Sequence, residues 1–127
     1  GSLANAQVGN GVLAGEITGT DPWVASPEEI HVNLDTSEKQ TVEIRMKNSS
    51  AATSARIFWQ EENESWFNGG VTFSISTNDT AYQVYEVDLS AEPAWTGTVS
   101  RVRFDPAQGS FQVQSGDSFV LDYIQFR

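Results

Sequence analysis

The sequence contains no cysteine and a single histidine among its 127 residues. Without cysteine there is no disulfide framework, no thiolate ligand for zinc and no thiol nucleophile. A lone histidine, His31, also excludes the common zinc sites, which need several histidine or cysteine ligands. The absence of disulfides is compatible with a bacterial extracellular domain and does not exclude a cytosolic one.

Positive charge and long apolar runs are scarce as well. Seven lysine and arginine residues against seventeen aspartate and glutamate residues give a formal net charge of −10. Such a charge repels nucleic acid phosphates and anionic membranes. No stretch approaches the roughly 20 apolar residues that a membrane helix needs. We therefore expect neither a nucleic acid nor a membrane as partner.

The length and composition predict one domain. A chain of 127 residues with 39% apolar residues can enclose one core and is too short for two ordinary domains. Residues 1–11 are small and polar and begin with Gly1 and Ser2, as an expression-tag scar does, so we expect a scar and linker there. The chain would then be cut from a longer protein, with residues 12–127 as a single domain, monomeric when isolated.

Apolar and polar residues alternate along most of the chain, and almost no helical period is present. The clearest case is residues 41–47, with Val42, Ile44 and Met46 on one face. Strands are expected at residues 12–18, 30–33, 41–47, 55–60, 71–76, 82–89, 99–105 and 118–126. Loops of varied length separate them. The pattern predicts an all-β fold in which two antiparallel sheets pack face to face as a jelly-roll sandwich.

Short motifs occur in a fixed order along the chain: GTDPW, VEIRMKNSS, ARIFWQ, YEVDLS, AWTG, VRFDP and LDYIQF. As an ordered set they resemble the jelly-roll, carbohydrate-binding-module-like domains of galactose-binding-like fold. Such domains are found in large secreted bacterial polysaccharide-degrading enzymes and in surface-layer-associated proteins. The resemblance covers about residues 12–127. It implies a non-catalytic extracellular module, covalently linked to a catalytic or anchoring domain and frequently holding a structural calcium ion.

The last expected strand contains an acid, Asp122, in the row of Ile124 if the strand alternates strictly. A carboxylate in an apolar row needs a partner, which could be an arginine, backbone N–H groups or a calcium ion. In the modules that the chain resembles, the first and last strands lie side by side and their carboxylates meet at such an ion. The resemblance therefore implies a calcium site made by Asp122 and Glu16, with Asp21 or a backbone carbonyl as a further ligand, although similar modules often lack an acid at the position of Glu16.

Five of the seven cationic side chains fall on outward positions of three expected strands: Arg45, Lys47, Arg56, Arg101 and Arg103. One interpretation is cross-strand ion pairing, which would mainly order the sheets. The acids in reach are Glu43, Glu86, Asp88 and Asp105. The other interpretation is a sheet face where Arg45, Arg103 and Gln60 hold sugar hydroxyls or a uronic carboxylate. The ring of Phe58 would lie beside them.

Residues 58–70, FWQEENESWFNGG, place aromatic residues among acids and amides in an expected loop. Sugars have weakly apolar C–H faces and a rim of hydroxyls, so a binding site combines a flat ring with polar side chains around it. Trp66 and Trp95 have such surroundings, as does Trp23. A loop tryptophan can also close one end of a sandwich core, and the sequence leaves both interpretations open. Alternation turns Trp59 inward, into the core.

Catalysis is the remaining class of function. Glu61, Glu62 and Glu64 lie close together, and a glycosidase needs two carboxylates at a set separation. A solvated acidic loop provides neither that separation nor the raised pKa that one of the two must have. We therefore predict a non-catalytic module that targets an attached enzyme or surface protein to a polysaccharide outside a bacterial cell. The alternatives are a structural or protein-interaction spacer without sugar affinity and a small polysaccharide hydrolase or lyase.

Overall fold

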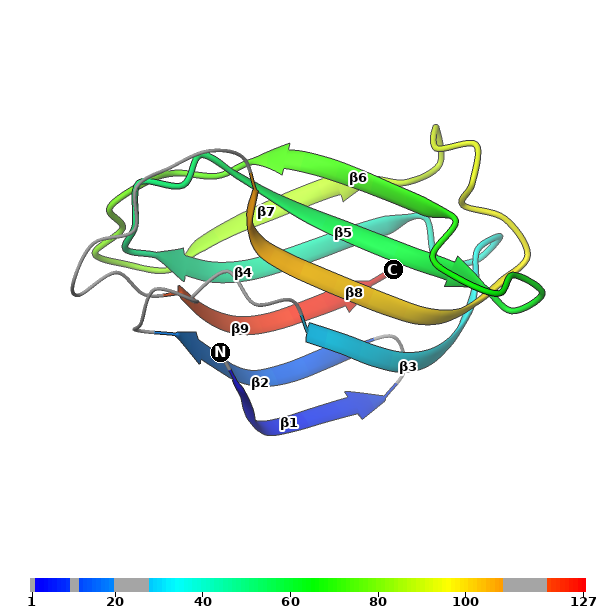
Figure 1. Cartoon of the computed structure of the whole chain (residues 1–127), viewed down its shortest axis with the longest axis horizontal. Helices are drawn as coiled ribbons and strands as arrows, with labels where there is room; N and C mark the ends of the chain where they lie inside the picture. Colours follow the sequence, from blue (N-terminus) through cyan, green and yellow to red (C-terminus); the bar gives the residue numbers. More distant parts are fainter. Residues whose placement is uncertain (1, 10–11, 20–27, 109–118) are drawn as a thin grey trace.

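The computed structural model describes residues 2–9, 12–19, 28–108 and 119–127. Within these residues there are nine β-strands: β1 (Ser2–Gly9), β2 (Val12–Gly19), β3 (Glu28–Asp35), β4 (Thr41–Asn48), β5 (Ser54–Glu61), β6 (Gly69–Ser74), β7 (Gln83–Asp88), β8 (Thr98–Gln108) and β9 (Phe119–Phe126). They form two sheets, ordered β1-β2-β9-β4-β7 and β3-β8-β5-β6, in which all strand pairs are antiparallel. The sheets pack face to face (Figure 1), which confirms the predicted all-β jelly-roll sandwich.

The opening residues form β1, where the sequence predicts a linker. Ser2 pairs with Thr18 and Gly9 pairs with Val12, so β1 is the edge strand beside β2. The prediction of a linker over residues 1–11 is therefore wrong for most of that segment. Strand pairing uses backbone N–H and C=O groups, so small side chains can join a sheet without leaving an alternating pattern in the sequence.

One hydrophobic core lies between the two sheets. Alternation turns Val42, Ile44 and Met46 of β4 inward, and all three are buried, as predicted. Trp59 of β5 is fully buried as well, which confirms its assignment to the core. Its indole Nε1–H donates a hydrogen bond of 2.8 Å to the carbonyl oxygen of Ala94, so the one polar group of the ring is satisfied.

Strand β9 departs from strict alternation at Asp122. Leu121 before this residue and Ile124 after it are both buried. In a regular strand these two residues would point to opposite sides, because their numbers differ by an odd amount. The register against β4 shifts here, and Tyr123 pairs with Arg45, which marks a β-bulge. The side chain of Asp122 is consequently 44% exposed. The prediction that Asp122 interrupts a buried row is therefore wrong, because alternation in the sequence does not reveal a bulge.

The sheet topology decides which side chains share an outer surface. Strands β5 and β8 are neighbours at the centre of the four-stranded sheet, whereas β4 and β9 are neighbours in the five-stranded sheet. The two sheets form the two layers of the molecule (Figure 1), so the outer face of β4 and the outer face of β5 and β8 are on opposite sides. Among the residues that the structure describes, no helix is long and apolar enough to span a membrane.

Candidate functional site

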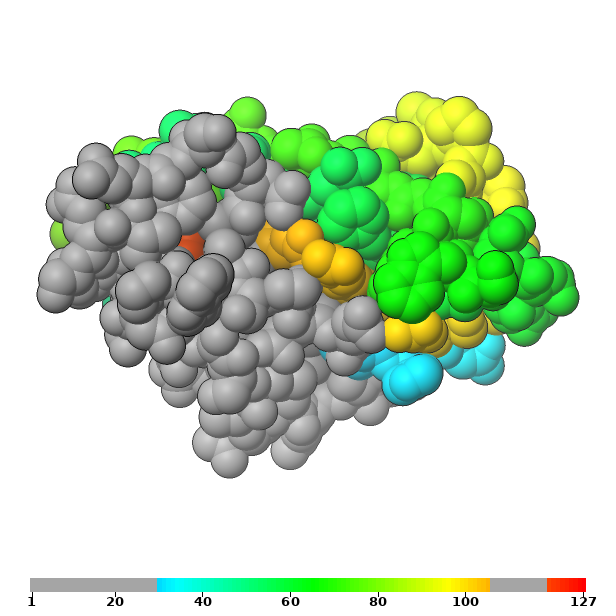
Figure 2. All heavy atoms as spheres, viewed as in Figure 1, coloured from blue at the N-terminus to red at the C-terminus, as the bar shows by residue number. Residues whose placement is uncertain are grey.

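The outer surface of the four-stranded sheet gathers arginines and aromatic rings. On β5 the inward residues are buried, so the alternate residues face outward, and those of β8 do the same. In register, Phe58 lies opposite Arg103 and Gln60 lies opposite Arg101. We call this surface the arginine–aromatic face and define it by Arg56, Phe58, Gln60, Trp66, Phe67, Arg101 and Arg103. Figure 2 views the molecule from this side, with atoms of β5, of β8 and of the segment after β5 exposed.

Guanidinium groups stack on the rings of this face. The Cζ atom of Arg56 lies 4.4 Å from the centroid of the Phe58 ring, and that of Arg103 lies 5.3 Å from the same centroid. The Cζ atom of Arg101 lies 5.1 Å from the Phe67 centroid and 5.7 Å from the Trp66 centroid. All four distances are within the range of cation–π attraction, about 6 Å. These contacts join side chains of β5 and β8 to the loop between β5 and β6.

The loop that carries Trp66 is anchored to β5. The side-chain nitrogen Nε2 of Gln60 donates a hydrogen bond of 2.7 Å to the carbonyl oxygen of Glu64. At the end of the loop, the side-chain oxygen of Asn68 accepts a hydrogen bond of 2.8 Å from the backbone N–H of Glu61. Trp66 remains 59% exposed, so it does not close the core. Its ring meets Phe67 edge to face, with centroids 5.3 Å apart.

Polar groups surround the rings. Arg103 donates from Nε and Nη2 to the two carboxylate oxygens of Asp105, at 2.9 and 3.3 Å. Arg101 donates from Nη1 to the side-chain oxygen of Gln60 at 3.2 Å. Nε of Arg56 is buried and has no hydrogen-bond partner among the described residues. The face therefore combines flat apolar surfaces with N–H donors in fixed positions.

A glycine keeps the flank of this face clear. Gly70 of β6 lies opposite Phe58, where a side chain would otherwise stand beside the ring. A Cβ atom at this position would lie 3.0 Å from Cδ1 of Phe58 and 3.2 Å from Nε of Arg56, closer than ordinary contact. The sequence does not reveal this role, since it depends on the register between β5 and β6.

The structure separates two of the six residues predicted to bind a saccharide from the rest. Trp66, Phe58, Gln60 and Arg103 come together on the arginine–aromatic face. Trp95 is only 6% exposed, stacks on Phe126 with centroids 5.8 Å apart, and donates from Nε1 to the carbonyl oxygen of Lys39 at 2.6 Å. It closes the core and presents no ring to a ligand.

Arg45 also differs from its expected place. It lies on the outer face of the five-stranded sheet and forms an ion pair with Asp122, with 2.6 Å between Nη1 and Oδ2. Its Cζ atom lies 4.2 Å from the centroid of the Tyr82 ring. Alternation indicates that Arg45 points outward, but it does not indicate which sheet the strand of Arg45 joins. The sequence alone therefore could not show that Arg45 lies on a different face from the arginines of β5 and β8.

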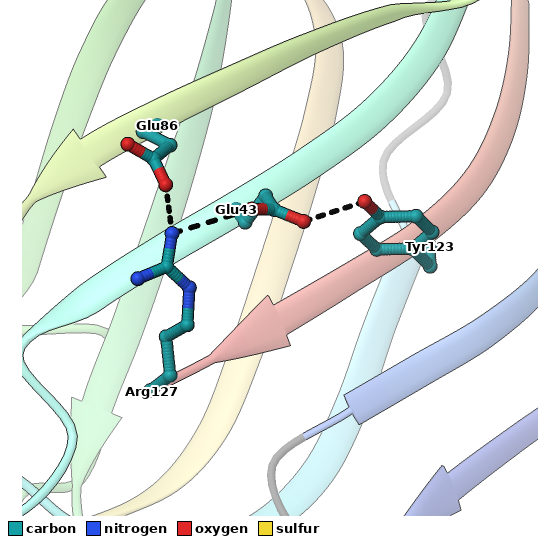
Figure 3. Close-up of polar contacts among 4 residues, drawn as sticks. All are labelled: Glu43, Glu86, Tyr123 and Arg127. Carbon is teal, nitrogen blue, oxygen red and sulfur yellow. Dashed lines mark hydrogen bonds and ion pairs between the residues drawn. The ribbon is translucent and has the colours of Figure 1, made fainter.

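Beside this pair, the five-stranded sheet carries a polar network (Figure 3). Glu43 accepts hydrogen bonds from the hydroxyl of Tyr123 at 2.5 Å and from Nη2 of Arg127 at 3.2 Å. Arg127 also pairs with Glu86. The bond from Tyr123 holds the pKa of Glu43 below its ordinary value, with a smaller contribution from Arg127, and raises the pKa of Tyr123 above its ordinary value. This face corresponds to the ion-pairing interpretation.

The structure treats the three predicted calcium ligands differently, and it describes only two of them. Asp122 has an arginine partner, which already compensates its charge. The backbone of Glu16 lies beside Asp122, since Ala14 pairs with Tyr123 on the neighbouring strand β9 and a register shift follows. Asp21 lies outside the described residues, as does Trp23. In the described part of the chain no three or more His, Cys, Asp or Glu side chains form a group that could hold a metal ion. Calcium therefore stays a prediction.

The acidic residues of the loop after β5 lie on the surface. Glu62 and Glu64 are exposed. Glu61 is partly exposed and accepts hydrogen bonds from the backbone and side-chain nitrogens of Asn63, at 2.9 and 3.1 Å. Its carboxylate therefore holds the turn in place.

Comparison with known proteins places the fold. The sequence matches no protein-family model and no curated protein. A solved structure of a glycoside hydrolase family 43 arabinoxylan arabinofuranohydrolase from Bacillus subtilis, in complex with cellotetraose, is similar over 89% of this chain, with 14% identity and a TM-score of 0.54. The Endo-D glycoside hydrolase domain from Streptococcus pneumoniae is similar over 90% of the chain, with 13% identity and a TM-score of 0.52. The chain spans 21% and 18% of the lengths of those two structures.

Most of the other similar structures are carbohydrate-binding modules. One is a family 11 module from Clostridium thermocellum in complex with a β-1,3-1,4-mixed-linked tetrasaccharide, which has 16% identity and a TM-score of 0.47 and matches over 91% of this chain and 88% of that one. At such identities the likeness concerns the fold alone. Structures of that kind are thus among those similar to this chain, as the resemblance in the sequence led us to expect.

Proposed function

We propose that this chain is a non-catalytic carbohydrate-binding module that takes a saccharide on the arginine–aromatic face. The observation that carries the proposal is the position of Trp66, a 59% exposed indole beside guanidinium and amide donors. Tryptophan is enriched at binding surfaces, where one side of the ring meets an apolar group of the ligand and its surroundings stay polar. A sugar matches both parts of this surface, because its C–H face stacks on an aromatic ring and its hydroxyls accept hydrogen bonds from N–H groups.

The residues of the face divide this work between them. Trp66 provides a platform for the sugar ring, and Phe58 extends the apolar surface along β5. Arg103 stands at its edge, and Gln60, which is buried, holds the loop of Trp66 in place through its hydrogen bond to Glu64. Because most of these residues stand on β5 and β8 rather than on a mobile loop, little conformational freedom is lost on binding.

The biological role follows from linkage to other domains. A module of this kind holds an attached enzyme or surface protein on a polymeric substrate and raises its local concentration there, so even weak affinity is useful. The chain spans about a fifth of each of two glycoside hydrolase structures that share its fold, which is compatible with such an arrangement. We propose an extracellular bacterial setting, with covalently linked catalytic or anchoring domains as partners.

Replacing Trp66 by alanine tests this function. In native affinity gels that contain a panel of soluble polysaccharides, we expect the wild-type chain to be retarded by at least one polymer. The Trp66→Ala variant should lose that retardation, while its melting temperature should change little because the ring is exposed. Val84→Ala is the matched control, since Val84 is 53% exposed but stands on β7, in the other sheet.

Two outcomes would overturn the proposal. If Trp66→Ala is retarded as strongly as the wild-type chain, the arginine–aromatic face is not the binding site. If no polysaccharide retards the wild-type chain, the domain is a spacer without sugar affinity. A large fall in the melting temperature of Trp66→Ala would instead assign that ring to structure.

A further inference from the structure

Strand β6 runs along one edge of the four-stranded sheet and pairs only with β5 (Figure 1). In step with that pairing, the backbone N–H of Ile75 donates a hydrogen bond of 3.0 Å to the carbonyl oxygen of Thr53. Alternate residues of an antiparallel strand direct their N–H and C=O groups to the same side. Gly70, Thr72 and Ser74 therefore direct theirs to the free edge, where the structure gives them no hydrogen-bond partner among the described residues.

The other three edge strands carry features that discourage a new pairing. Strands β1 and β3 have register shifts against their neighbours, and β3 and β7 contain acids. Soluble proteins commonly blunt their edge strands by such irregularities, by charge or by proline. Strand β6 has none of these, since its register against β5 is unbroken and residues 65–78 contain no charged residue and no proline. Among the described strands, β6 is the unguarded edge.

The charge of the molecule decides which partner strand suits this edge. Two chains that each carry a net charge of −10 repel one another, so they approach most easily where neither presents an acid. The nearest acids along the chain, Glu64 and Asp79, each lie five residues outside β6. A charged peptide from another protein finds no complementary charge on this strand, whereas a strand that pairs with its own copy about a two-fold axis matches itself.

A two-fold axis at Thr72 matches all the free-edge groups of β6. Thr72 would lie opposite the partner's Thr72, and Gly70 opposite the partner's Ser74, so each residue with free N–H and C=O groups meets another such residue. The side chains in this outward row are small, and facing threonines form a favourable cross-strand pair. In the inward row, Val71 would lie opposite the partner's Phe73 and continue the apolar side of the sheet.

The edge strand of the other sheet, β7, does not turn its acids toward this contact. The rings of Phe73 on β6 and Tyr85 on β7 have centroids 5.7 Å apart, so the two edges lie side by side. Tyr85 and Val87 form the row of β7 that packs against the core. Glu86 and Asp88 belong to the opposite row, on the outer face of the five-stranded sheet.

We propose that two copies of this chain pair along β6, antiparallel about a two-fold axis at Thr72, and join their four-stranded sheets into one continuous sheet. Because the axis is perpendicular to that sheet, both arginine–aromatic faces lie on the same side. Resting on the proposed function, the dimer presents two saccharide sites to one polymer, which strengthens binding by avidity. The dimer departs from the monomer that the sequence predicts, because alternation does not show which strand has a free edge.

Sedimentation velocity of the full chain, over about a hundredfold range of concentration, tests the contact by mass action. We expect a reversible monomer–dimer equilibrium that tightens at higher salt, because salt screens the repulsion between two acidic chains. Thr72→Lys places two like charges opposite each other at the axis, so its dimer dissociation constant should rise about tenfold or more. Thr96→Lys makes the same change at an exposed residue outside the strands, and this matched control should dimerise as the wild-type chain does.

Cysteine cross-linking tests the position of the axis. The chain contains no cysteine, so Thr72→Cys introduces a single thiol. Residues directly opposite each other in an antiparallel pair have Cα atoms about 4.5–5.5 Å apart, which a disulfide can span. Treated with the thiol oxidant diamide, Thr72→Cys should form a covalent dimer, whereas Thr96→Cys should give only the background from random collision. Both variants should melt as the wild-type chain does under reducing conditions, since both sites are exposed.

The failures of the two proposals can be told apart. A chain that stays monomeric throughout, an association that Thr72→Lys leaves unchanged, or growth beyond dimers would overturn the β6 contact. Cross-linking of Thr72→Cys no stronger than that of Thr96→Cys would overturn the axis at Thr72. If the chain dimerises as expected but no polysaccharide retards it, the proposed function fails and the dimer stands.

Where both proposals hold, the dimer should matter for polymers alone. Thr72→Lys should bind a retarding polysaccharide more weakly than the wild-type chain does, and a short oligosaccharide of the same sugar equally well, because only a polymer reaches both sites. Equal binding of the polysaccharide by the two chains would overturn the shared saccharide face.

Discussion

At the scale of single residues, Gly69 has the tightest surroundings. This first residue of β6 lies against the indole of Trp59, and a Cβ atom here would overlap that buried ring. Overfilling a core costs about 1–3 kcal/mol and occasionally more. We expect Gly69→Ala to lower the free energy of unfolding by about 2 kcal/mol or more in urea denaturation.

The neighbouring glycine is the control for that substitution. A Cβ at Gly70 would meet Phe58 at 3.0 Å and Arg56 at 3.2 Å, and both side chains have room to move at the surface. Gly70→Ala should therefore cost less than about 1 kcal/mol. Equal losses in the two variants would mean that the ring of Trp59 can shift, against its fixed position in the core.

Tyr123 sets the titration of Glu43. The pKa of Glu43 is lower in the folded than in the unfolded state, so its interactions stabilise the fold above pH 4.5, the ordinary value, and are lost as the pH falls through the folded-state value. The pKa of Tyr123 is raised, so its contribution is present below pH 10.0 and is lost as the pH rises through its folded-state value. Tyr123→Phe should therefore raise the pKa of Glu43 and weaken the acid dependence of stability.

Carboxyl NMR titration of Glu43 measures this effect directly. Because Arg127 still contacts Glu43 in Tyr123→Phe, the pKa should move only part of the way to its ordinary value. Tyr82→Phe, on the same side of the molecule, removes a hydroxyl that does not touch Glu43 and serves as control. An unchanged pKa in Tyr123→Phe would show that the hydrogen bond from the phenol does not control the titration of this acid.

Sequence reasoning reached some residues and not others, for a physical reason. Trp59 could be assigned to the core because it stands on a strand, where alternation decides which side a residue faces. Trp66 and Trp95 both lie in connections between strands, where alternation does not decide which way a side chain points. Only the fold separates them, because Trp95 finds Phe126 to stack on while Trp66 points away from the core.

At the scale of elements, the junction of β2 and β9 is where a calcium ion is predicted. Both strands have irregular pairing there, which brings the backbone of Glu16 beside Asp122. If an ion is bound, excess chelator should lower the melting temperature and added calcium should restore it, because a ligand of the folded state alone stabilises that state. Asp122→Asn should lack the calcium-dependent part of the shift. A melting temperature that changes neither with chelator nor with added calcium would count against a bound ion.

Alternation predicted the outward row of each strand but not the neighbours of that row. The inward residues of β4, β5 and β8 are buried as the sequence predicts, although Gln60 and Asp105 of the outward rows are buried as well. The pairing of β5 with β8, and of β4 with β9 and β7, depends on contacts between segments far apart in the chain. This is why the residues of β5 and β8 that the sequence predicts to bind a saccharide lie together, whereas Arg45 lies on the other sheet.

At the scale of the whole molecule, the order of strands makes some segments indispensable. Strand β9 lies between β2 and β4, in the middle of its sheet, whereas β1 lies at the edge (Figure 1). Deleting residues 119–127 would break both pairings and remove part of the core, so we expect no cooperative unfolding by circular dichroism or tryptophan fluorescence. Deleting residues 1–9 removes a single edge pairing and should leave a cooperative transition at lower temperature.

The result is contradicted if the chain without β9 still unfolds cooperatively. Loss of folding on removal of β1 would equally contradict it, since the edge strand would then be essential. Both deletions remove a similar length of chain, so a difference between them reflects position in the sheet rather than size.

The central place of the last strand also bears on how the chain is made. Strands β3, β5, β6 and β8 are all synthesised before β9, so the four-stranded sheet can assemble while its partner is still incomplete. Until β9 has left the ribosome, the apolar side of that first sheet has no complete cover. A nascent chain of this protein therefore has to wait for its final strand, and during that interval it is a natural client for chaperones.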